Sequence, residues 1–153
     1  MSKKVIMVSG GFDPIHVGHV RMIQEAAEYG DVLVAVNSDE WLKRKKGFIF
    51  MPWEQRVEIL YALADVSDVC AVDDSDGTVC SAITLHRPDY FANGGDRGRE
   101  NTPEMDVCEN LDIEMLWGVG GEDKANSSSH IVKNAIEAVS QTKTGAFKNL
   151  ENK

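Results

Sequence analysis

Two histidines three residues apart, His16 and His19, are the residues of this sequence best suited to chemistry on a phosphate. If a helix begins around Val17, this spacing brings both imidazoles to one helical face. The unpaired amides of the first helical turn then point at the same place and favour an anion. Gly18 leaves room for a phosphate to approach the backbone. The pattern predicts a phosphate site at the start of this helix, with both histidines beside it.

The glycine pair Gly10-Gly11 ends an apolar run and turns the chain toward the histidines. Residues 5–8, VIMV, are typical of a strand buried on both faces of a parallel sheet. Pro14 fixes φ before the helix, and neither GxGxxG nor the P-loop pattern GxxxxGK[ST] is present. The histidines could be surface or core residues without a role. Their position at a strand-Gly-Gly-helix junction, the ligand crevice of doubly wound sheets, favours a functional site.

Strands and helices are predicted to alternate along the rest of the chain. The expected strands are residues 5–8, 32–38, 66–72, 90–92 and 113–119. The expected helices run from about 17 to Gly30, from 53 to about 65, from 78 to about 86, from 103 to 111 and from about 127 onward. On the second helix, the residues expected to face the core are Val57, Leu60, Tyr61 and Ala64.

This alternation indicates an α/β fold with a Rossmann-like, doubly wound, five-stranded parallel sheet. Residues 39–46 are interpreted as a short basic stretch, and the tail 140–153 as flexible. Glycine-rich strand ends at 10–13, 93–96 and 119–126 are expected to line one crevice at the carboxyl edge of the sheet.

A run of three serines follows the last of these glycine-rich loops, and its members are Ser127, Ser128 and Ser129. One serine could simply cap the final helix. Three consecutive hydroxyls at a helix N-terminus would also make a second cradle for a polyphosphate, and we favour this interpretation.

The composition is that of an ordinary globular protein. With 153 residues, of which 42% are hydrophobic and 27% charged, residues 1–153 are expected to form a single domain. No apolar stretch approaches the roughly 20 residues of a membrane span, and the apolar run near the N-terminus is shorter than we expect of a signal sequence. The three cysteines lack the spacing of a disulfide framework or zinc site. These features predict a cytoplasmic protein that has no metal-ligating residues and no membrane partner.

The net charge of −9 argues against a nucleic-acid-binding protein, because affinity for a polyanion depends on spread positive charge. A small anionic substrate needs only a local basic patch. The densest one is Lys43-Arg44-Lys45-Lys46.

Five blocks of the sequence carry a family resemblance: GGFDPIHVGH, AVNSDEWLKRKKG, PWEQRVEILYAL, NGGD and SSSHIVK. Together they resemble the HxGH nucleotidyltransferases, the cytidylyltransferase-like family. They are similar to the blocks of glycerol-3-phosphate cytidylyltransferases and, more closely, of heptose-1-phosphate adenylyltransferases. The resemblance extends to about residue 139.

The resemblance implies roles for individual residues. His16, His19 and Lys46 would be catalytic, Lys46 and Arg56 would bind substrate, and Asp96 would lie beside the nucleoside. The residues implied to bind the nucleotide are Gly10, Gly11, Phe12, Asp13, Gly18, Asp96, Ser127, Ser128 and Ser129. No metal ligand is implied, and Mg²⁺ would arrive with the nucleotide.

The implied reaction moves a nucleoside monophosphate from a nucleoside triphosphate (NTP) to a small phosphorylated acceptor, such as a sugar or polyol phosphate, and releases pyrophosphate. ATP is favoured over CTP, because residues 122–125 are EDKA where cytidylyltransferases have RTEG. This departure leaves one alternative open, a catalytically weak nucleotide-binding or sensing protein on the same fold. The resemblance also implies a homodimer, because members of the family commonly form dimers.

Overall fold

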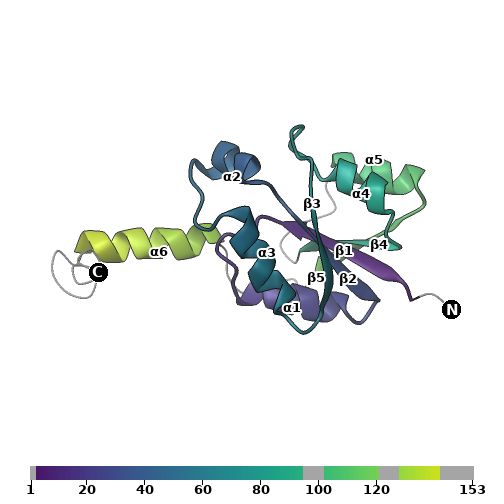
Figure 1. Ribbon diagram of the computed structural model, residues 1–153, viewed down its shortest axis with the longest axis horizontal. Helices are drawn as coiled ribbons and strands as arrows, with labels where there is room; N and C mark the ends of the chain where they lie inside the picture. The colour runs from purple at the N-terminus through teal and green to yellow at the C-terminus, as the bar shows by residue number, and fades with distance from the viewer. Residues whose placement is uncertain (1–2, 95–101, 121–127, 142–153) are drawn as a thin grey trace.

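Five parallel strands form a single sheet in the order β3-β2-β1-β4-β5 (Figure 1). The computed structural model describes residues 3–94, 102–120 and 128–141. The strands are β1 Val5–Gly10, β2 Asp31–Val36, β3 Val66–Ala71, β4 Tyr90–Gly94 and β5 Glu114–Val119. The helices are α1 Val17–Ala26, α2 Asp39–Lys46, α3 Trp53–Tyr61, α4 Cys80–His86, α5 Pro103–Asn110 and α6 Ser128–Gln141. The strand order reverses between β1 and β4, which confirms the predicted doubly wound fold.

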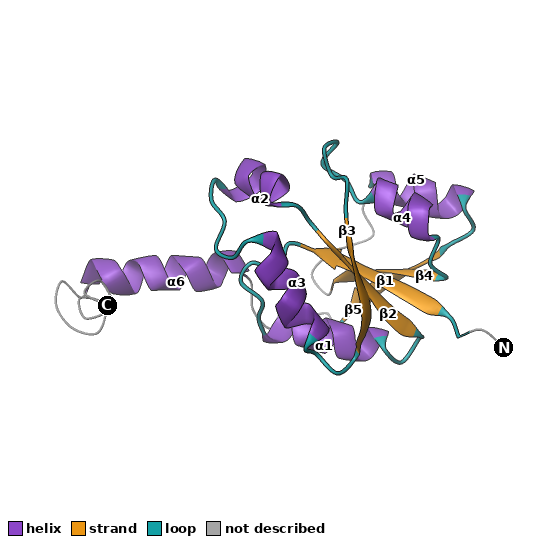
Figure 2. Cartoon of the chain, viewed as in Figure 1, coloured by secondary structure: helices purple, strands orange, loops and turns teal. Residues whose placement is uncertain are grey.

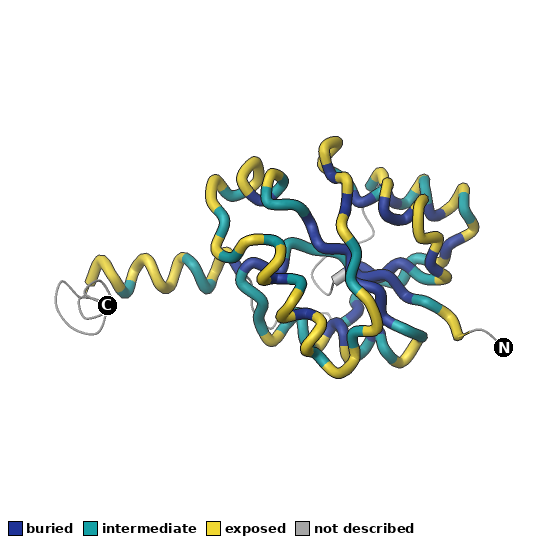
Figure 3. The backbone as a smooth tube through the Cα atoms, in the orientation of Figure 1, coloured by how far each residue is buried: buried dark blue, intermediate teal, exposed yellow. Residues whose placement is uncertain are grey.

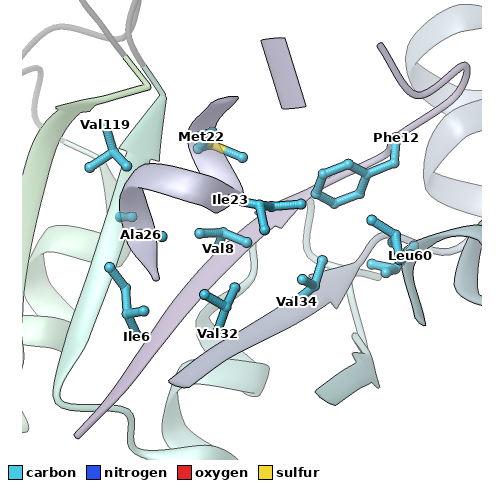
Figure 4. Close-up of a cluster of buried hydrophobic side chains, with 12 residues drawn as sticks. Ile6, Val8, Phe12, Met22, Ile23, Ala26, Val32, Val34, Leu60 and Val119 are labelled. Carbon is cyan, nitrogen blue, oxygen red and sulfur yellow. The ribbon is translucent and has the colours of Figure 1, made fainter. Parts of the chain in front are cut away.

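Apolar side chains fill both faces of this sheet. On one face, Ile23 of α1 and Leu60 of α3 pack against alternate residues of β1 and β2 (Figure 4). On the other face, Ile83 of α4 and Cys108 of α5 pack against the intervening residues. The buried segments follow the strands, whereas α6 is mostly exposed (Figure 3). Burial on both faces explains why the strands of the sheet centre are nearly continuous apolar runs.

Residues 39–46, interpreted from the sequence as a basic stretch, form the helix α2. The Ser38 side chain caps it by accepting a hydrogen bond from the Trp41 amide at 3.1 Å. Acidic residues lie in its first turn and basic residues in its last, which complements the helix dipole. Gly47 ends it in the left-handed conformation, with a φ of +85°. The described chain therefore contains six helices, one more than predicted.

Two predicted helix boundaries were wrong. The helix α3 ends at Tyr61, and Tyr61 and Ala64, which were expected in the core, are exposed. The helix α1 ends at Ala26 rather than at Gly30. Gly30 instead allows the backbone to approach Lys4 closely, because a Cβ there would lie 2.3 Å from the backbone oxygen of Lys4.

The helix α6 extends away from the sheet (Figure 2). Its last turn includes Ser140 and Gln141, which the sequence had placed in the tail. Within the described ranges, no helix is both long enough and apolar enough to cross a membrane.

Candidate active site

His16 and His19 close the N-terminus of α1 with a reciprocal pair of hydrogen bonds. The Gly18 amide donates to Nδ1 of His16 at 3.0 Å, and the His16 amide donates to Nδ1 of His19 at 3.1 Å. The ring centroids lie 3.9 Å apart, so both imidazoles share one face of the helix as predicted. Because each Nδ1 accepts a hydrogen bond, a neutral ring carries its proton on Nε2 and donates from there.

The glycine loop between β1 and α1 packs tightly against α2. A Cβ on Gly11 would lie 2.8 Å from Cδ2 of Leu42, so a larger residue requires a shift. Phe12 has a φ of +54°, which is unfavourable for a residue with a side chain. Its buried ring lies 4.7 Å from the ring of His19. The backbone path and the packed phenyl ring together fix the loop beside the first turn of α1.

Asp13 uses both carboxylate oxygens within the protein. The Phe50 amide donates to Oδ2 at 2.6 Å, the Met51 amide donates to Oδ1 at 2.7 Å, and Asp13 is only 2% exposed. These bonds tie the segment before α3 to the glycine loop. They give Asp13 a positioning role, and the nucleotide contact expected of it stays a prediction.

Lys46 reaches the same loop from the last turn of α2. Its Nζ donates to the backbone oxygen of Asp13 at 3.4 Å. Partial burial lowers the pKa of the ammonium group, although the Asp13 carboxylate acts in the opposite direction. The candidate lysine and the glycine loop, which are far apart in sequence, are therefore adjacent in the structure.

Arg56 is buried beneath this loop. Its guanidinium donates to the backbone oxygens of Gly11 at 2.7 Å, Asn37 at 2.8 Å and Met51 at 3.0 Å. It also forms a 2.6 Å ion pair with Asp39, and the Arg56 side chain is 0% exposed. These bonds join α3 to the ends of β1 and β2. Arg56 was expected to bind substrate; its described hydrogen bonds give it a positioning role, and a substrate contact stays a prediction.

The N-terminus of α6 lies against the loop that leads into α1. The Ser128 hydroxyl donates to the backbone oxygen of Pro14 at 2.8 Å, and Ser128 is buried. Ser129 is exposed. Two further residues of the predicted site, Asp96 and Ser127, lie outside the described residues.

A buried network at the start of α2 was not indicated by the sequence pattern. The Asp74 carboxylate accepts hydrogen bonds from Nδ2 of Asn37 at 3.0 Å and from the amide and hydroxyl of Ser38 at 2.8 and 2.6 Å. Burial acts to raise the pKa of Asp74, but the hydrogen bonds from Ser38 and Asn37 outweigh it, and the pKa is lowered. The available signal was the polar pair Asn37-Ser38 directly after an apolar strand.

Hydrogen-bond donors thus gather at one end of the sheet. They are the imidazoles at the N-terminus of α1, the Lys46 ammonium and the N-terminus of α6. Such donors bind phosphate oxygens and stabilise charge that develops on them. Among the described residues, no group of three or more His, Cys, Asp or Glu side chains could hold a metal ion.

Known proteins resemble this chain in sequence. The family model "Cytidylyltransferase-like" matches residues 7–135. The bifunctional protein HldE of Geobacter metallireducens is 35% identical over 136 residues, which are 86% of this chain and 27% of that protein. The HldE protein of Citrobacter koseri is 38% identical over 123 residues, which are 78% of this chain and 24% of that protein. The chain therefore spans about a quarter of the length of these relatives.

A solved structure shares the fold. The crystal structure of the lipopolysaccharide core biosynthesis protein from Thermoplasma volcanium matches with a TM-score of 0.64 and 20% identity, over 82% of this chain and 100% of that chain. The family match covers the glycine loop, α1 and the start of α6, and it confirms the resemblance and the enzyme class of nucleotidyltransferase. The chain belongs to the cytidylyltransferase-like family.

Proposed function

We propose that the chain transfers a nucleoside monophosphate from an NTP to a small phosphorylated acceptor, such as a sugar or polyol phosphate, with release of pyrophosphate. The observation that carries the proposal is the meeting of two helix N-termini. Ser128, which begins α6, donates to the backbone oxygen of Pro14, and His16 just beyond caps α1. Two neighbouring N-termini offer adjacent anion sites, as a triphosphate requires.

The proposed mechanism is direct transfer. A phosphate oxygen of the acceptor attacks the α-phosphorus of the NTP and forms a new P–O bond. The bond from the α-phosphorus to the oxygen that bridges to the β-phosphate breaks, and pyrophosphate leaves with the electron pair. The Nε2 atoms of His16 and His19 would donate to the phosphate oxygens that gain charge. A well-placed donor of this kind is worth on the order of 10²- to 10³-fold in rate.

Lys46 would bind a phosphate group of the acceptor or of the NTP. It extends from α2 toward the glycine loop, and the other basic residues of α2 raise the local positive potential. Mg²⁺ would enter as part of the substrate, bound to the triphosphate. The Asp13 carboxylate already accepts hydrogen bonds from two backbone amides. This supports the ligation of Mg²⁺ by the phosphates rather than by Asp13.

ATP is the proposed nucleotide. The sequence likeness is closer to adenylyltransferases, and residues 122–125 depart from the pattern of the cytidylyltransferases. The sequence blocks are more similar to those of heptose-1-phosphate adenylyltransferases than to those of the cytidylyltransferases, which supports a sugar phosphate as the acceptor class to test first.

Pyrophosphate release would test this function. ATP, CTP, GTP and UTP would each be incubated with sugar phosphates, polyol phosphates and phosphopantetheine. We expect release with ATP and one acceptor class. A kcat/KM at least about tenfold higher with CTP would contradict the nucleotide preference. Nucleotide binding without release in any combination would contradict the transfer reaction.

We also propose a homodimer. The exposed apolar residues Ile136 and Val139 on α6 support it, because an unpacked helix of 14 residues is marginal by itself.

A further inference from the structure

Asn93 carries a buried side-chain amide without a hydrogen-bond acceptor. The residue is 4% exposed, and its Nδ2 is the only buried side-chain N or O atom without a partner in the part of the chain that the structure describes. The other buried asparagine of this sheet edge, Asn37, donates to Asp74 at 3.0 Å. An amide that leaves water without gaining an acceptor is unfavourable for folding. The contacts within the described chain therefore do not explain the buried Asn93 amide.

The position of Asn93 offers an explanation. It lies one residue before the end of β4, and β4 is the neighbour of β1 at the point where the strand order reverses. Met7 of β1 pairs with Phe91 in parallel, and Asn93 lies two residues further along β4, toward the same edge at which β1 enters the glycine loop. In open α/β sheets, ligands bind in the crevice at this reversal point.

The proposed phosphate-binding groups occupy the other part of this crevice. Lys46 belongs to α2, which follows β2, and β2 and β4 flank β1 on opposite sides. The loop after β1 supplies His16 and the contact to Ser128. A triphosphate bound over β1 would thus leave the β4 side of the crevice for the nucleoside. The neutral Nδ2 donor of Asn93 suits a neutral acceptor, such as a ring nitrogen or carbonyl oxygen of a base.

We propose that Nδ2 of Asn93 donates a hydrogen bond to the base of the bound nucleotide and thereby positions it. This inference rests on the proposed function, because it needs an NTP in the crevice. It assigns Asn93, at the end of β4, a part in nucleotide recognition.

Two measurements on Asn93→Leu test the inference: thermal unfolding without ligand and calorimetric titration with ATP. The substitution removes the unpaired amide at nearly constant volume, so the unfolding midpoint should stay equal or rise. The Kd for ATP should rise about tenfold. Ribose 5-triphosphate, which has the phosphates and the sugar but no base, should bind the variant and the parent protein equally.

Asn37→Leu is the matched control for buried asparagine, because it removes a paired amide and should lower the unfolding midpoint. Asn93→Ala repeats the test with a smaller side chain. Destabilisation of both Asn93 variants, or unchanged ATP affinity in both, would overturn the inference. An equal loss of affinity for ATP and ribose 5-triphosphate would overturn the contact to the base. Failure of the parent protein to bind any NTP would instead refute the proposed function.

Discussion

The two histidines of the candidate site each have a structural and a proposed chemical task, divided between the two ring nitrogens. Each Nδ1 accepts a backbone amide at the start of α1, which organises the helix N-terminus. This bond fixes the tautomer of a neutral ring, so Nε2 is the donor for a phosphate oxygen. A substitution that removes the whole ring therefore tests both tasks together, and a partial replacement is needed to separate them.

His19→Ala should lower kcat by about 10²- to 10³-fold, because it removes a donor to charge that develops during transfer. It should also lower the free energy of unfolding by about 1 kcal/mol, because a partner in the cap of α1 is lost. Both quantities should be measured on one preparation. The control is His86→Ala, an exposed histidine of α4, which should leave kcat unchanged.

His19→Asn and His19→Gln should recover part of the rate, because a neutral amide still donates. A loss of activity that follows unfolding across these variants would leave His19 with the capping role alone. Full activity in a folded alanine variant would remove its catalytic role.

Lys46→Ala should raise KM for one phosphate-bearing substrate by about tenfold and change kcat less, because a flexible ammonium binds ground and transition states alike. Lys43→Ala, three residues earlier on the same helix and exposed, is the charge-matched control. Steady-state kinetics with each substrate varied in turn would measure the effect. Equal KM values in the two variants and the parent protein would contradict a role in substrate binding.

At the scale of elements, α2 is the connection between the buried network and the site. Its first turn is held by Ser38 and Asp74, its middle packs on Gly11 through Leu42, and its last turn presents Lys46. Asp74 thus acts at one end of a helix whose other end reaches the candidate site.

Asp74→Ala should lower the free energy of unfolding by about 1–3 kcal/mol, because it leaves the buried Asn37 amide without its acceptor and removes a hydrogen-bond partner of Ser38. The folded pKa of Asp74 is lowered, so its stabilisation is present above the unfolded pKa of about 3.9 and is lost as pH falls through the folded pKa. The difference between parent and variant in denaturant unfolding should therefore be full near neutral pH and shrink in acid.

Asp65→Ala is the control for this substitution, because Asp65 is exposed. A difference in stability between parent and Asp74→Ala that persists unchanged well into the acid range would contradict the assigned role of the carboxylate.

The sequence predicted the elements with apolar periodicity and missed those held by polar contacts. β1, β2 and α1 carry enough apolar residues to be located by pattern, and the family motif located His16 and His19. α2 was not predicted as a helix, because it has too few apolar residues to show a helical period. It is stabilised instead by polar contacts of Ser38 and Asp74 at its start. The buried position of Arg56 could not be predicted either, because its acceptors come from segments distant in sequence.

At the scale of the molecule, α6 is the element least explained by the fold of one chain. Of its residues, only Ser128 is buried, while Ile136 and Val139 are 61% and 48% exposed. The helix nevertheless begins at the candidate site, through the Ser128 bond to Pro14. A partner that packs on α6 would therefore also support one wall of that site.

A second copy of the chain is the partner that we expect on α6. In an antiparallel pair of these helices centred near Ala135, Lys133 would face Glu137 of the partner subunit, and the apolar residues would meet between them. Ile136→Asp should convert a dimer to a monomer in sedimentation equilibrium, because it buries an unpaired charge at the contact. Leu85→Asp is the matched control, since Leu85 is 77% exposed on α4, and it should leave the dimer intact. A monomeric parent protein, or a dimer that persists in Ile136→Asp, would show that α6 does not join two chains.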